Sequence, residues 1–365
     1  MARLGISVYP ERGGTEQDLE YIRKAGDYGY ERMFTCLLSV GDLKREELVD
    51  RYRLRIDEAH RAGMEVMLDV DPAVFQRLGA SCDDLSIFRK MHADGIRLDA
   101  GFDAGTISRM TYDRQGMKIE LNASMDPESI GYVLSYHPDR SRLVTCHNFY
   151  PQRYTGLSLE HFRKCNETVK GCGLDVAAFV SSRQEGAFGP WPVSEGLCTL
   201  ELHRELPVDF QVRHLFATGL VDDVLIANAY ASDKELEACA EADPAVLTFG
   251  FIPERELTDV EQAILHFEEG HVIRGDMSTY MLRSTQPRVV YRECQILPEG
   301  PRDLKRGDVV IVNDRYPRYK GELQVVLQEM PNDGRKNVIG HLPGYEQMLL
   351  DHAEPWRTFS FVMCR

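Results

Sequence analysis

The sequence predicts an α/β fold: a closed (β/α)₈ TIM barrel followed by a small β-rich domain. Eight short segments rich in β-branched and aromatic residues recur in residues 1–244, and helical patterns separate most of them. Eight strand–helix units in about 240 residues is the usual size of such a barrel. An open doubly wound sheet needs only slightly different connections, but no GxGxxG follows the first predicted strand and no GxxxxGKS/T occurs. The closed barrel is therefore the favoured fold.

Strands of the barrel are expected where apolar residues run between turn signals. They span residues 4–10, 32–38, 65–71, 95–102, 118–124, 143–150, 175–182 and 223–230. Helices are expected over residues 15–29, 43–63, 104–116, 126–137, 158–173 and 232–242. Asp103, Ser158 and Ser232 are of the types that cap a helix N-terminus. Gly26 and Gly171 lie near predicted helix ends, where glycine serves as a C-terminal cap.

After Pro244 the rhythm of the pattern changes, and residues 245–365 are expected to form a second, β-rich domain. Strands are predicted at residues 245–252, 277–284, 288–294, 308–314, 323–330 and 336–342, with one helix near 257–267. Within residues 302–320, six basic residues accompany three acidic ones. This local positive charge either binds an anionic group on a small substrate or belongs to a solvated, charge-balanced hairpin.

The composition excludes several classes of function. The net charge of −15 repels nucleic-acid phosphates and anionic membranes, so we expect neither as a partner. No apolar run reaches the roughly 18 to 20 residues that cross a bilayer, and no secretory signal is recognisable, so we expect a cytoplasmic protein. The nine cysteines show no CxxC pair and no metal-ligand spacing, so we expect reduced thiols, no bound metal and no cofactor.

Polar residues gather at the C-terminal ends of the predicted barrel strands and in the loops that follow, where barrel enzymes carry their active sites. They are Asp69, Arg97, Asp99, Asn122, His147, Asn148, Tyr150, Glu201, His203, Arg204 and Asn228. Carboxylates beside amides, a histidine and a tyrosine suit a polyhydroxylated substrate, because an acid and a base or nucleophile then stand beside hydroxyl-binding groups. Glycoside hydrolysis is the activity that these residue types favour.

Some of these residues also have a structural interpretation. Arg97 and Asp99 share one face of their strand and could form a buried ion pair in the barrel interior. Glu120 precedes the end of its strand and is expected in a lower layer of the interior. His147 and Asn148 point to opposite faces if their strand continues, so that only one of them would face the substrate.

Several longer strings carry a resemblance to a known family. In chain order they are RLDAGF, IELNAS, HNFYPQRYTGLS, GPWPVSEGLCTLELHREL, RGDVVIVNDRYPRYKGELQ and NVIGHL. Through them the chain resembles the 6-phospho-N-acetylmuramidases over essentially its whole length. The resemblance implies a TIM barrel, a cyclophilin-like C-terminal domain, and cleavage of the β-1,4 bond in 6-phospho-N-acetylmuramyl-N-acetylglucosamine during cytosolic recycling of cell-wall disaccharides.

The resemblance also implies roles for the residues at matching positions. These are Asp69, Asp99, Asn122, His147, Asn148, Tyr150, Glu201, His203 and Arg204 in the barrel, and Arg288, Asn313, Tyr316, Arg318, Tyr319 and Glu322 in the second domain. Arg288 and Arg318 are expected to bind the 6-phosphate, with Tyr319 donating from its hydroxyl. Glu201 or Asp99 is expected to be the general acid, and Asp69 or Asp99 the opposing carboxylate. Retention, inversion and assistance by the acetamide group of the substrate all stay open.

Two other functions stay open. A sugar-phosphate isomerase or epimerase could use His147 and Glu201 as acid and base, whereas a Schiff-base aldolase is disfavoured because no lysine ends a predicted strand. A non-catalytic sugar-phosphate sensor would bind the same disaccharide without turnover. A homodimer is open as well, since residues 302–320 could close over the protein's own barrel or over a neighbouring one.

Overall fold

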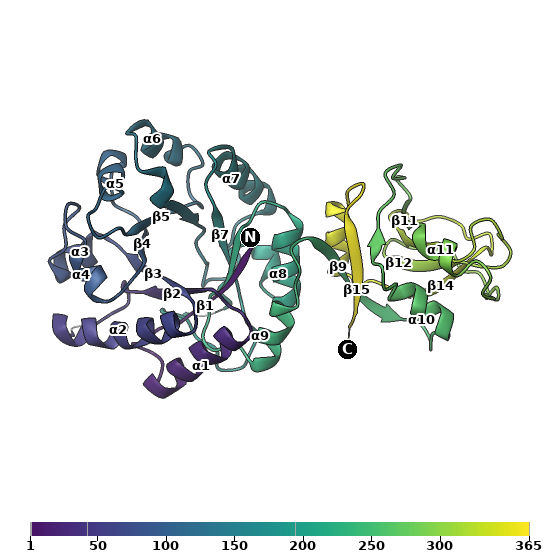
Figure 1. Cartoon of the computed structure of the whole chain (residues 1–365), viewed down its shortest axis with the longest axis horizontal. Coiled ribbons are helices and arrows are strands. Elements are labelled where there is room, and N and C mark those ends of the chain that lie inside the picture. The colour runs from purple at the N-terminus through teal and green to yellow at the C-terminus, as the bar shows by residue number, and fades with distance from the viewer. Residues whose placement is uncertain (1, 42, 194, 365) are drawn as a thin grey trace. The chain divides into compact units, whose positions relative to one another are not determined.

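Eight parallel strands close into a barrel in the first of two compact units, Met1–Glu241 and Ala242–Arg365, of this computed structural model. The structure describes residues 2–41, 43–193 and 195–364. The barrel strands neighbour one another in chain order: β1 (Arg3–Ser7), β2 (Arg32–Cys36), β3 (Glu65–Val70), β4 (Gly95–Leu98), β5 (Lys118–Asn122), β6 (Leu143–Cys146), β7 (Val176–Val180) and β8 (Asp223–Ile226). The predicted fold class is thus confirmed, and helices surround these strands (Figure 1).

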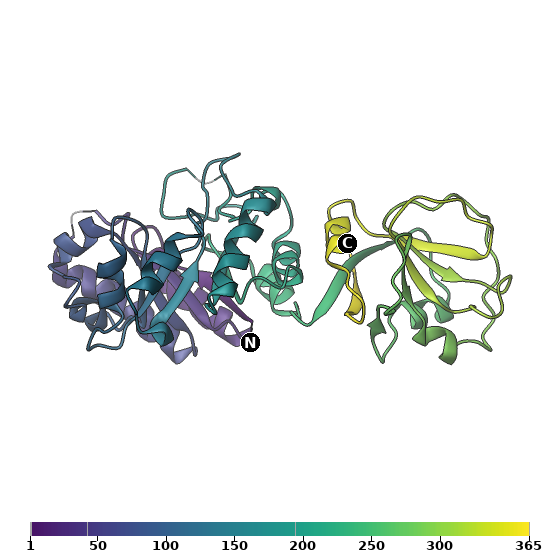
Figure 2. The ribbon, with the colours of Figure 1, turned by 90° about the horizontal axis from the view of Figure 1, so that it is seen from above.

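The helices of the barrel unit follow the strands or precede them in the chain. They are α1 (Thr15–Asp27), α2 (Arg45–Arg61), α3 (Pro72–Leu78), α4 (Ser86–Lys90), α5 (Ala104–Met110), α6 (Ser129–Ser135), α7 (Leu159–Gly171), α8 (Val208–Ala217) and α9 (Asp233–Ala240). In Figure 2 the chain starts at one edge of the barrel, and the loops after β6 and β7 rise from the opposite edge. That edge holds the carboxyl ends of all eight strands, because the strands are parallel.

All eight predicted strands are present, and each ends earlier than its apolar pattern. β4 ends at Leu98 rather than at residue 102, and β6 ends at Cys146 rather than at residue 150. The polar residues that come next leave the hydrogen-bonded ladder and start loops. Asp99 and Asn148 therefore belong to the rim of the barrel and not to its strands.

The six predicted helices of the barrel unit are also present. Asp103, Ser158 and Ser232 each accept a hydrogen bond from a backbone N–H of the first helical turn, as predicted. The assignment of Gly26 and Gly171 as C-terminal caps is wrong, since both are helical residues at the ends of α1 and α7.

Three helices were not expected from the sequence. α3 nevertheless has a start signal, because the Asp71 side chain accepts from Val74 N at 2.7 Å and Pro72 occupies the first helical position. The short helix α4 has only five residues, too few for a periodic pattern. In α8 the buried polar residues Gln211 and His214 interrupt the apolar stripe.

A layer of buried charges fills the barrel interior near its N-terminal end. Arg32 binds Glu120 at 2.7 Å and Asp223 at 2.6 Å, and all three side chains are at most 4% exposed. Arg3 adds a second cation to Asp223 at 2.7 Å. Glu120 is therefore a lower-layer interior residue, as predicted, and each buried carboxylate has a cationic partner.

The second unit is a seven-stranded sheet with the strand order β10-β15-β9-β14-β12-β13-β11. Its elements are β9 (Val246–Pro253), α10 (Asp259–Leu265), β10 (His271–Val272), β11 (Met281–Ser284), α11 (Gln286–Val290), β12 (Asp308–Val312), β13 (Leu323–Val326), β14 (Lys336–His341), a 3₁₀ helix (Glu346–His352) and β15 (Thr358–Met363). Most pairs are antiparallel, but β15 returns from the end of the chain to lie parallel to β9. The small β-rich domain is thus present.

Two parts of the second unit differ from the sequence-based expectation. The strand predicted at residues 288–294 is wrong, because residues Gln286–Val290 form helix α11, with Pro287 in its first turn. The β-branched pair Val289 and Val290 suggested a strand, yet both side chains are exposed on this short helix. The final strand β15 was not predicted, although alternate residues such as Phe359 and Phe361 are buried in the sheet.

The charged layer yields the first prediction. Replacing Arg32 by Leu leaves Glu120 and Asp223 buried without their shared cation, so we expect the free energy of unfolding of the barrel to fall by about 3 to 5 kcal/mol. Chemical unfolding followed by circular dichroism measures this loss. The matched control is Lys24→Leu, which removes ion pairs of a 41% exposed side chain and should leave the stability nearly unchanged. Equal losses in the two variants would contradict this account.

Candidate active site

A cavity of about 150 Å³ opens at the carboxyl end of the barrel. Its lining combines aromatic walls with a charged and amide floor: Phe34, Leu38, Asp69, Arg97, Asp99, Asn148, Phe149, Phe179 and Trp191. Asp69 is the penultimate residue of β3, Arg97 lies in β4, and Asp99 follows directly after β4. Adjacent parallel strands thus bring together three ionisable groups that the sequence spreads over 31 positions, from 69 to 99.

Arg97 contacts three other residues that line this cavity. Its Nη1 donates to Asp69 at 2.7 Å and lies 3.4 Å from an oxygen of Asp99, while its Nη2 donates to the side-chain oxygen of Asn148. The guanidinium is only 3% exposed, so these oxygens replace the water that it loses. From the sequence, Arg97 was expected mainly as a structural ion-pair partner of Asp99. The structure gives it that ion pair and also places it on the cavity wall, beside both carboxylates.

The two carboxylates differ in exposure. The Asp69 side chain is 7% exposed and that of Asp99 is 39% exposed. Burial raises the pKa of Asp69 to about 6 although Arg97 lowers it, and the nearby charges of Asp99 and Glu120 raise it further. A buried carboxyl whose pKa is raised towards neutrality beside a more exposed carboxylate is the pattern of an acid and a base or nucleophile.

Two amides complete the floor of the site. Asn122, the last residue of β5, donates from Nδ2 to the Asn148 side-chain oxygen at 3.0 Å. Its own oxygen accepts from Ser124 N at 2.8 Å, and Ser124 Oγ in turn accepts from Asn148 N at 2.7 Å. Burial raises the pKa of Tyr150, against hydrogen bonds with Ser124 and Asn148 that lower it. Asn122 and Asn148 thus lie together, and that they bind substrate with Tyr150 stays a prediction.

Glu201 is bound by Arg204, whereas the sequence predicted that it transfers a proton. Arg204 binds it with two hydrogen bonds, of 2.7 and 2.6 Å, and the backbone N–H groups of Tyr154 and Gly156 donate to its two oxygens at 2.8 Å. The hydrogen bonds from Arg204 are the main cause that lowers the pKa of Glu201 to about 2. Arg204 also donates to Tyr150 O at 2.9 Å. The pair therefore fastens the loop after β6, and such a carboxylate is a poor proton donor at neutral pH.

Three residues predicted to bind substrate are buried in structural roles. His147 lies between Ser124 Oγ at 3.1 Å and Asn166 at 2.6 Å, and burial lowers its pKa to about 4. His203 is fully buried against His214, and Asn228 binds the backbone of Ser182 through both ends of its amide. Of the neighbours His147 and Asn148, only Asn148 lines the cavity.

In the second unit, one of the predicted phosphate ligands, Arg288, binds a buried carboxylate. Glu322 is fully buried, accepts from Arg283 at 2.6 Å and from Arg288 at 3.1 Å, and so neutralises part of their charge. The guanidinium of Arg288 also stacks over the ring of Tyr319, 5.2 Å from its centroid. Arg318 is exposed on the segment between β12 and β13. Arg283, Arg288, Tyr319 and Glu322 are connected by these contacts, and Arg318 precedes Tyr319 in the chain. We call these five residues the Arg288 cluster.

The sequence analysis did not single out the aromatic side of the cavity. Phe34 and Phe179 meet edge to face with centroids 5.1 Å apart, and Phe149 packs against both. Trp191, in the loop after β7, also lines the cavity. A signal existed for Trp191, since it is one of only two tryptophans and lies between two prolines in a loop that follows a barrel strand. Aromatic faces of this kind pack against the apolar faces of sugar rings.

The described residues contain no group of three or more His, Cys, Asp or Glu side chains that could hold a metal ion. Nor is any helix in residues 2–41, 43–193 and 195–364 long and apolar enough to cross a membrane.

Comparison with known proteins relates both units to one family. Residues 4–241 match the profile described as "6-phospho-N-acetylmuramidase, N-terminal", and residues 247–362 match "6-phospho-N-acetylmuramidase, C-terminal". The chain is similar to an uncharacterized B. cereus protein of known crystal structure, with 44% identity and a TM-score of 0.90 over 99% of each chain. It is also similar to a conserved Enterococcus faecalis protein of unknown function, with 28% identity and a TM-score of 0.75 over 99% of this chain and 96% of that one. A search of curated proteins finds no match.

The clamp formed by Glu201 and Arg204 yields the second prediction. Glu201→Gln removes a charged acceptor of four hydrogen bonds, so we expect the free energy of unfolding at neutral pH to fall by about 2 kcal/mol. Because the folded state lowers the pKa of Glu201 from 4.5 to about 2, this stabilisation is complete above pH 4.5 and is lost as the pH falls towards 2. Denaturation of both proteins across this pH range should show the difference closing.

The control for this experiment is Glu205→Gln, which changes a 57% exposed carboxylate of the same region. It should leave stability nearly unchanged. A stability difference for Glu201→Gln that stayed constant down to pH 2 would mean that the ion pair is not its source.

Proposed function

The chain belongs to the 6-phospho-N-acetylmuramidase family, and from this premise we propose that it hydrolyses the β-1,4 bond of 6-phospho-N-acetylmuramyl-N-acetylglucosamine. The family name indicates a glycosidase. The observation that carries the proposal is the pair Asp69 and Asp99, held on one guanidinium in a cavity with aromatic walls. We also propose that the reaction serves the recycling of cell-wall disaccharides in the cytoplasm.

Asp69 is the proton donor in this proposal. A general acid must hold its proton at the working pH, and burial raises the pKa of Asp69 to about 6. Arg97 supports the assignment, because one cation between two carboxyls balances the site when one carboxyl is protonated and the other ionised. Glu201, the other candidate acid, has a pKa near 2 and binds Arg204 instead.

Asp99 is the opposing carboxylate. It is the more exposed of the two and lines the cavity, so it can face the anomeric carbon or orient the acetamide group of the substrate. The oxygens of Asp69 and Asp99 that approach Arg97 lie 2.7 and 3.4 Å from the same nitrogen, so these two oxygens are at most about 6 Å apart. Carboxyl groups of inverting enzymes typically lie roughly 6.5 to 9.5 Å apart, so this closeness favours a retaining reaction, by a covalent or an acetamide-assisted route.

The 6-phosphate is assigned to the Arg288 cluster of the second unit. A guanidinium matches the oxygens of a phosphate in pairs, and a tyrosine hydroxyl adds a donor. Arg318 is the exposed member, whereas Arg288 already shares Glu322 with Arg283. Arg318 is therefore the arginine that we expect to contribute most to binding the phosphate, with Arg288 and Tyr319 beside it.

The competing isomerase has less support. It needs His147 and Glu201 as acid and base, but His147 is fully buried between Ser124 and Asn166, and Glu201 is fastened to Arg204. A sensor would bind the disaccharide without needing a carboxyl of raised pKa beside a second carboxylate. Hydrolysis makes use of both groups.

Turnover tests the function itself. The purified protein should cleave 6-phospho-N-acetylmuramyl-N-acetylglucosamine and leave its unphosphorylated twin nearly untouched, as chromatography of the released sugars would show.

Arg318→Gln should raise KM for the phosphorylated disaccharide about tenfold, because a charged hydrogen bond is lost. The control is Arg292→Gln, a 70% exposed arginine of the same unit, which should behave as the wild type. Equal cleavage of the two disaccharides would contradict phosphate recognition, and binding without cleavage would favour the sensor.

Leaving groups separate the roles of the two aspartates. Asp69→Asn should lower kcat on the disaccharide by about a hundredfold or more, but by less than about tenfold on a 4-nitrophenyl glycoside, whose leaving group needs little protonation. Asp99→Asn should lower kcat on both substrates.

Wild-type kcat/KM for the disaccharide should fall as the pH rises above about 6, where Asp69 loses its proton. Nuclear magnetic resonance of the first-formed sugar should show the β anomer, and the α anomer would exclude retention.

A further inference from the structure

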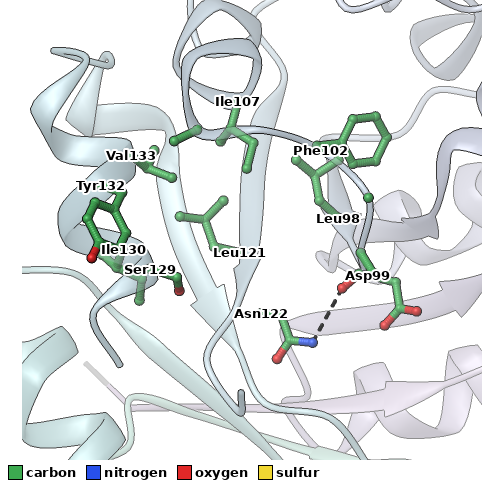
Figure 3. A pocket seen from close by; sticks show the side chains of 13 residues that line it. Leu98, Asp99, Phe102, Ile107, Leu121, Asn122, Ser129, Ile130, Tyr132 and Val133 are labelled. Carbon is green, nitrogen blue, oxygen red and sulfur yellow. Dashed lines mark hydrogen bonds between the residues drawn. The ribbon is translucent and has the colours of Figure 1, made fainter. Parts of the chain in front are cut away.

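A second cavity, of about 290 Å³, adjoins the first at Asp99. It lies between the outer face of the barrel strands β4 and β5 and the helices α5 and α6. Its walls are mainly apolar, formed by Leu98, Phe102, Ile107, Leu121, Ile130 and Val133. Figure 3 shows Asp99 and Asn122 together at one side of this cavity, with Ile107 and Val133 at the other. We call it the Leu121 pocket.

The alternation of side chains along the strands explains why the two cavities meet. Arg97 and Asp99 point into the barrel, and Leu98 between them points outwards to the helices. Leu121 and Asn122 repeat this arrangement on β5, with Leu121 outwards. Asp99 follows the last residue of β4 and lines both the catalytic cavity and the Leu121 pocket. A ligand bound at the catalytic carboxylate therefore has an apolar space beside it.

The chemistry of the lining defines what can enter. No lysine, arginine or histidine lines the Leu121 pocket in the part of the chain that the structure describes, so a carboxylate or phosphate would lack a counter-charge there. The polar groups stand at the rim. The Asp99 carboxylate accepts hydrogen bonds, and Asn122 Nδ2 donates one hydrogen to Asn148 at 3.0 Å and the other only weakly, to Asp99 O at 3.4 Å. An acceptor for an N–H, a donor for a C=O and an apolar space behind them match a neutral acylamino group.

We infer that the Leu121 pocket binds the 2-acylamino group of the sugar whose glycosidic bond is cleaved. This inference rests on the proposed function. The 2-acylamino group is attached to the carbon next to the anomeric carbon, so a sugar that reacts at Asp99 must carry this group within a few ångströms of it. Asp99 accepts from the acyl N–H, Asn122 donates to the acyl oxygen, and the alkyl end contacts Leu121, Ile107 and Val133.

The volume of the Leu121 pocket determines how long an acyl chain the protein can accept. A volume of about 290 Å³ exceeds what an acetyl group fills, so longer acyl chains should also be accepted. Ile107 of α5 is a suitable position for changing that volume, since it lines the pocket and is only partly buried. Ile107→Phe reduces the space, and Ile107→Ala enlarges it.

The test uses 4-nitrophenyl 6-phospho-β-muramides that carry an N-acetyl, N-propionyl or N-butyryl group. The wild-type protein should cleave the N-propionyl compound with kcat/KM within about threefold of the N-acetyl compound. Ile107→Phe should lower the butyryl-to-acetyl ratio of kcat/KM about tenfold, because added methylenes no longer fit, and Ile107→Ala should raise it. The ratio is measured within one variant, so a partial loss of folded protein does not change it.

Arg109→Leu is the matched control, because Arg109 lies on the same helix, is 66% exposed and does not line the pocket. Its acyl preference should equal that of the wild type. An unchanged ratio in both Ile107 variants, or rejection of the N-propionyl compound by the wild type, would overturn the inference while leaving the proposed function in place. If the wild type cleaves none of the compounds, nor the phosphorylated disaccharide, the proposed function and the inference both fail.

Discussion

The contact of Arg97 with Asp69 and Asp99 is the interaction on which the barrel mouth depends. One buried cation faces two carboxyls, and it can neutralise only one of them. The more buried carboxyl, Asp69, therefore binds a proton more readily than an ordinary aspartate. The same guanidinium orients Asn148, which is tied to Asn122. Acid, opposing carboxylate and amides are thus organised around a single side chain of β4.

The barrel scaffold makes this organisation possible through the two-residue period of its strands. The side chains of Arg97 and Leu98 lie on opposite sides of the barrel wall. One short segment therefore lines a polar cavity inside the barrel and an apolar pocket outside it. Below the mouth, Arg32 balances Glu120 and Asp223. The interior thus carries charge at two levels, and in both the cation comes from a strand and is almost fully buried.

Several residues with the chemistry of catalysts serve instead to hold others in place. Glu201 and Arg204 fasten the loop that carries Tyr150, and His147 joins the end of β6 to Asn166 of α7. Each is bound on more than one side, and burial or an ion pair moves its pKa away from neutrality. Residue type alone does not separate these roles from those of Asp69 and Asp99, because the difference lies in the partners that each group finds in three dimensions.

The sequence by itself determined the fold class, the eight strand positions and the set of polar residues at the rim, because these follow from local periodicity and from the rule that parallel strands end at one edge. It also placed Glu120 in the interior. Only the tertiary structure decided which rim residues face a cavity, since Arg97 and Asp69 come from different strands and Glu201 from a distant loop. Burial and ion pairing are properties of the assembled barrel, and they set the proton affinity that distinguishes Asp69 from Glu201.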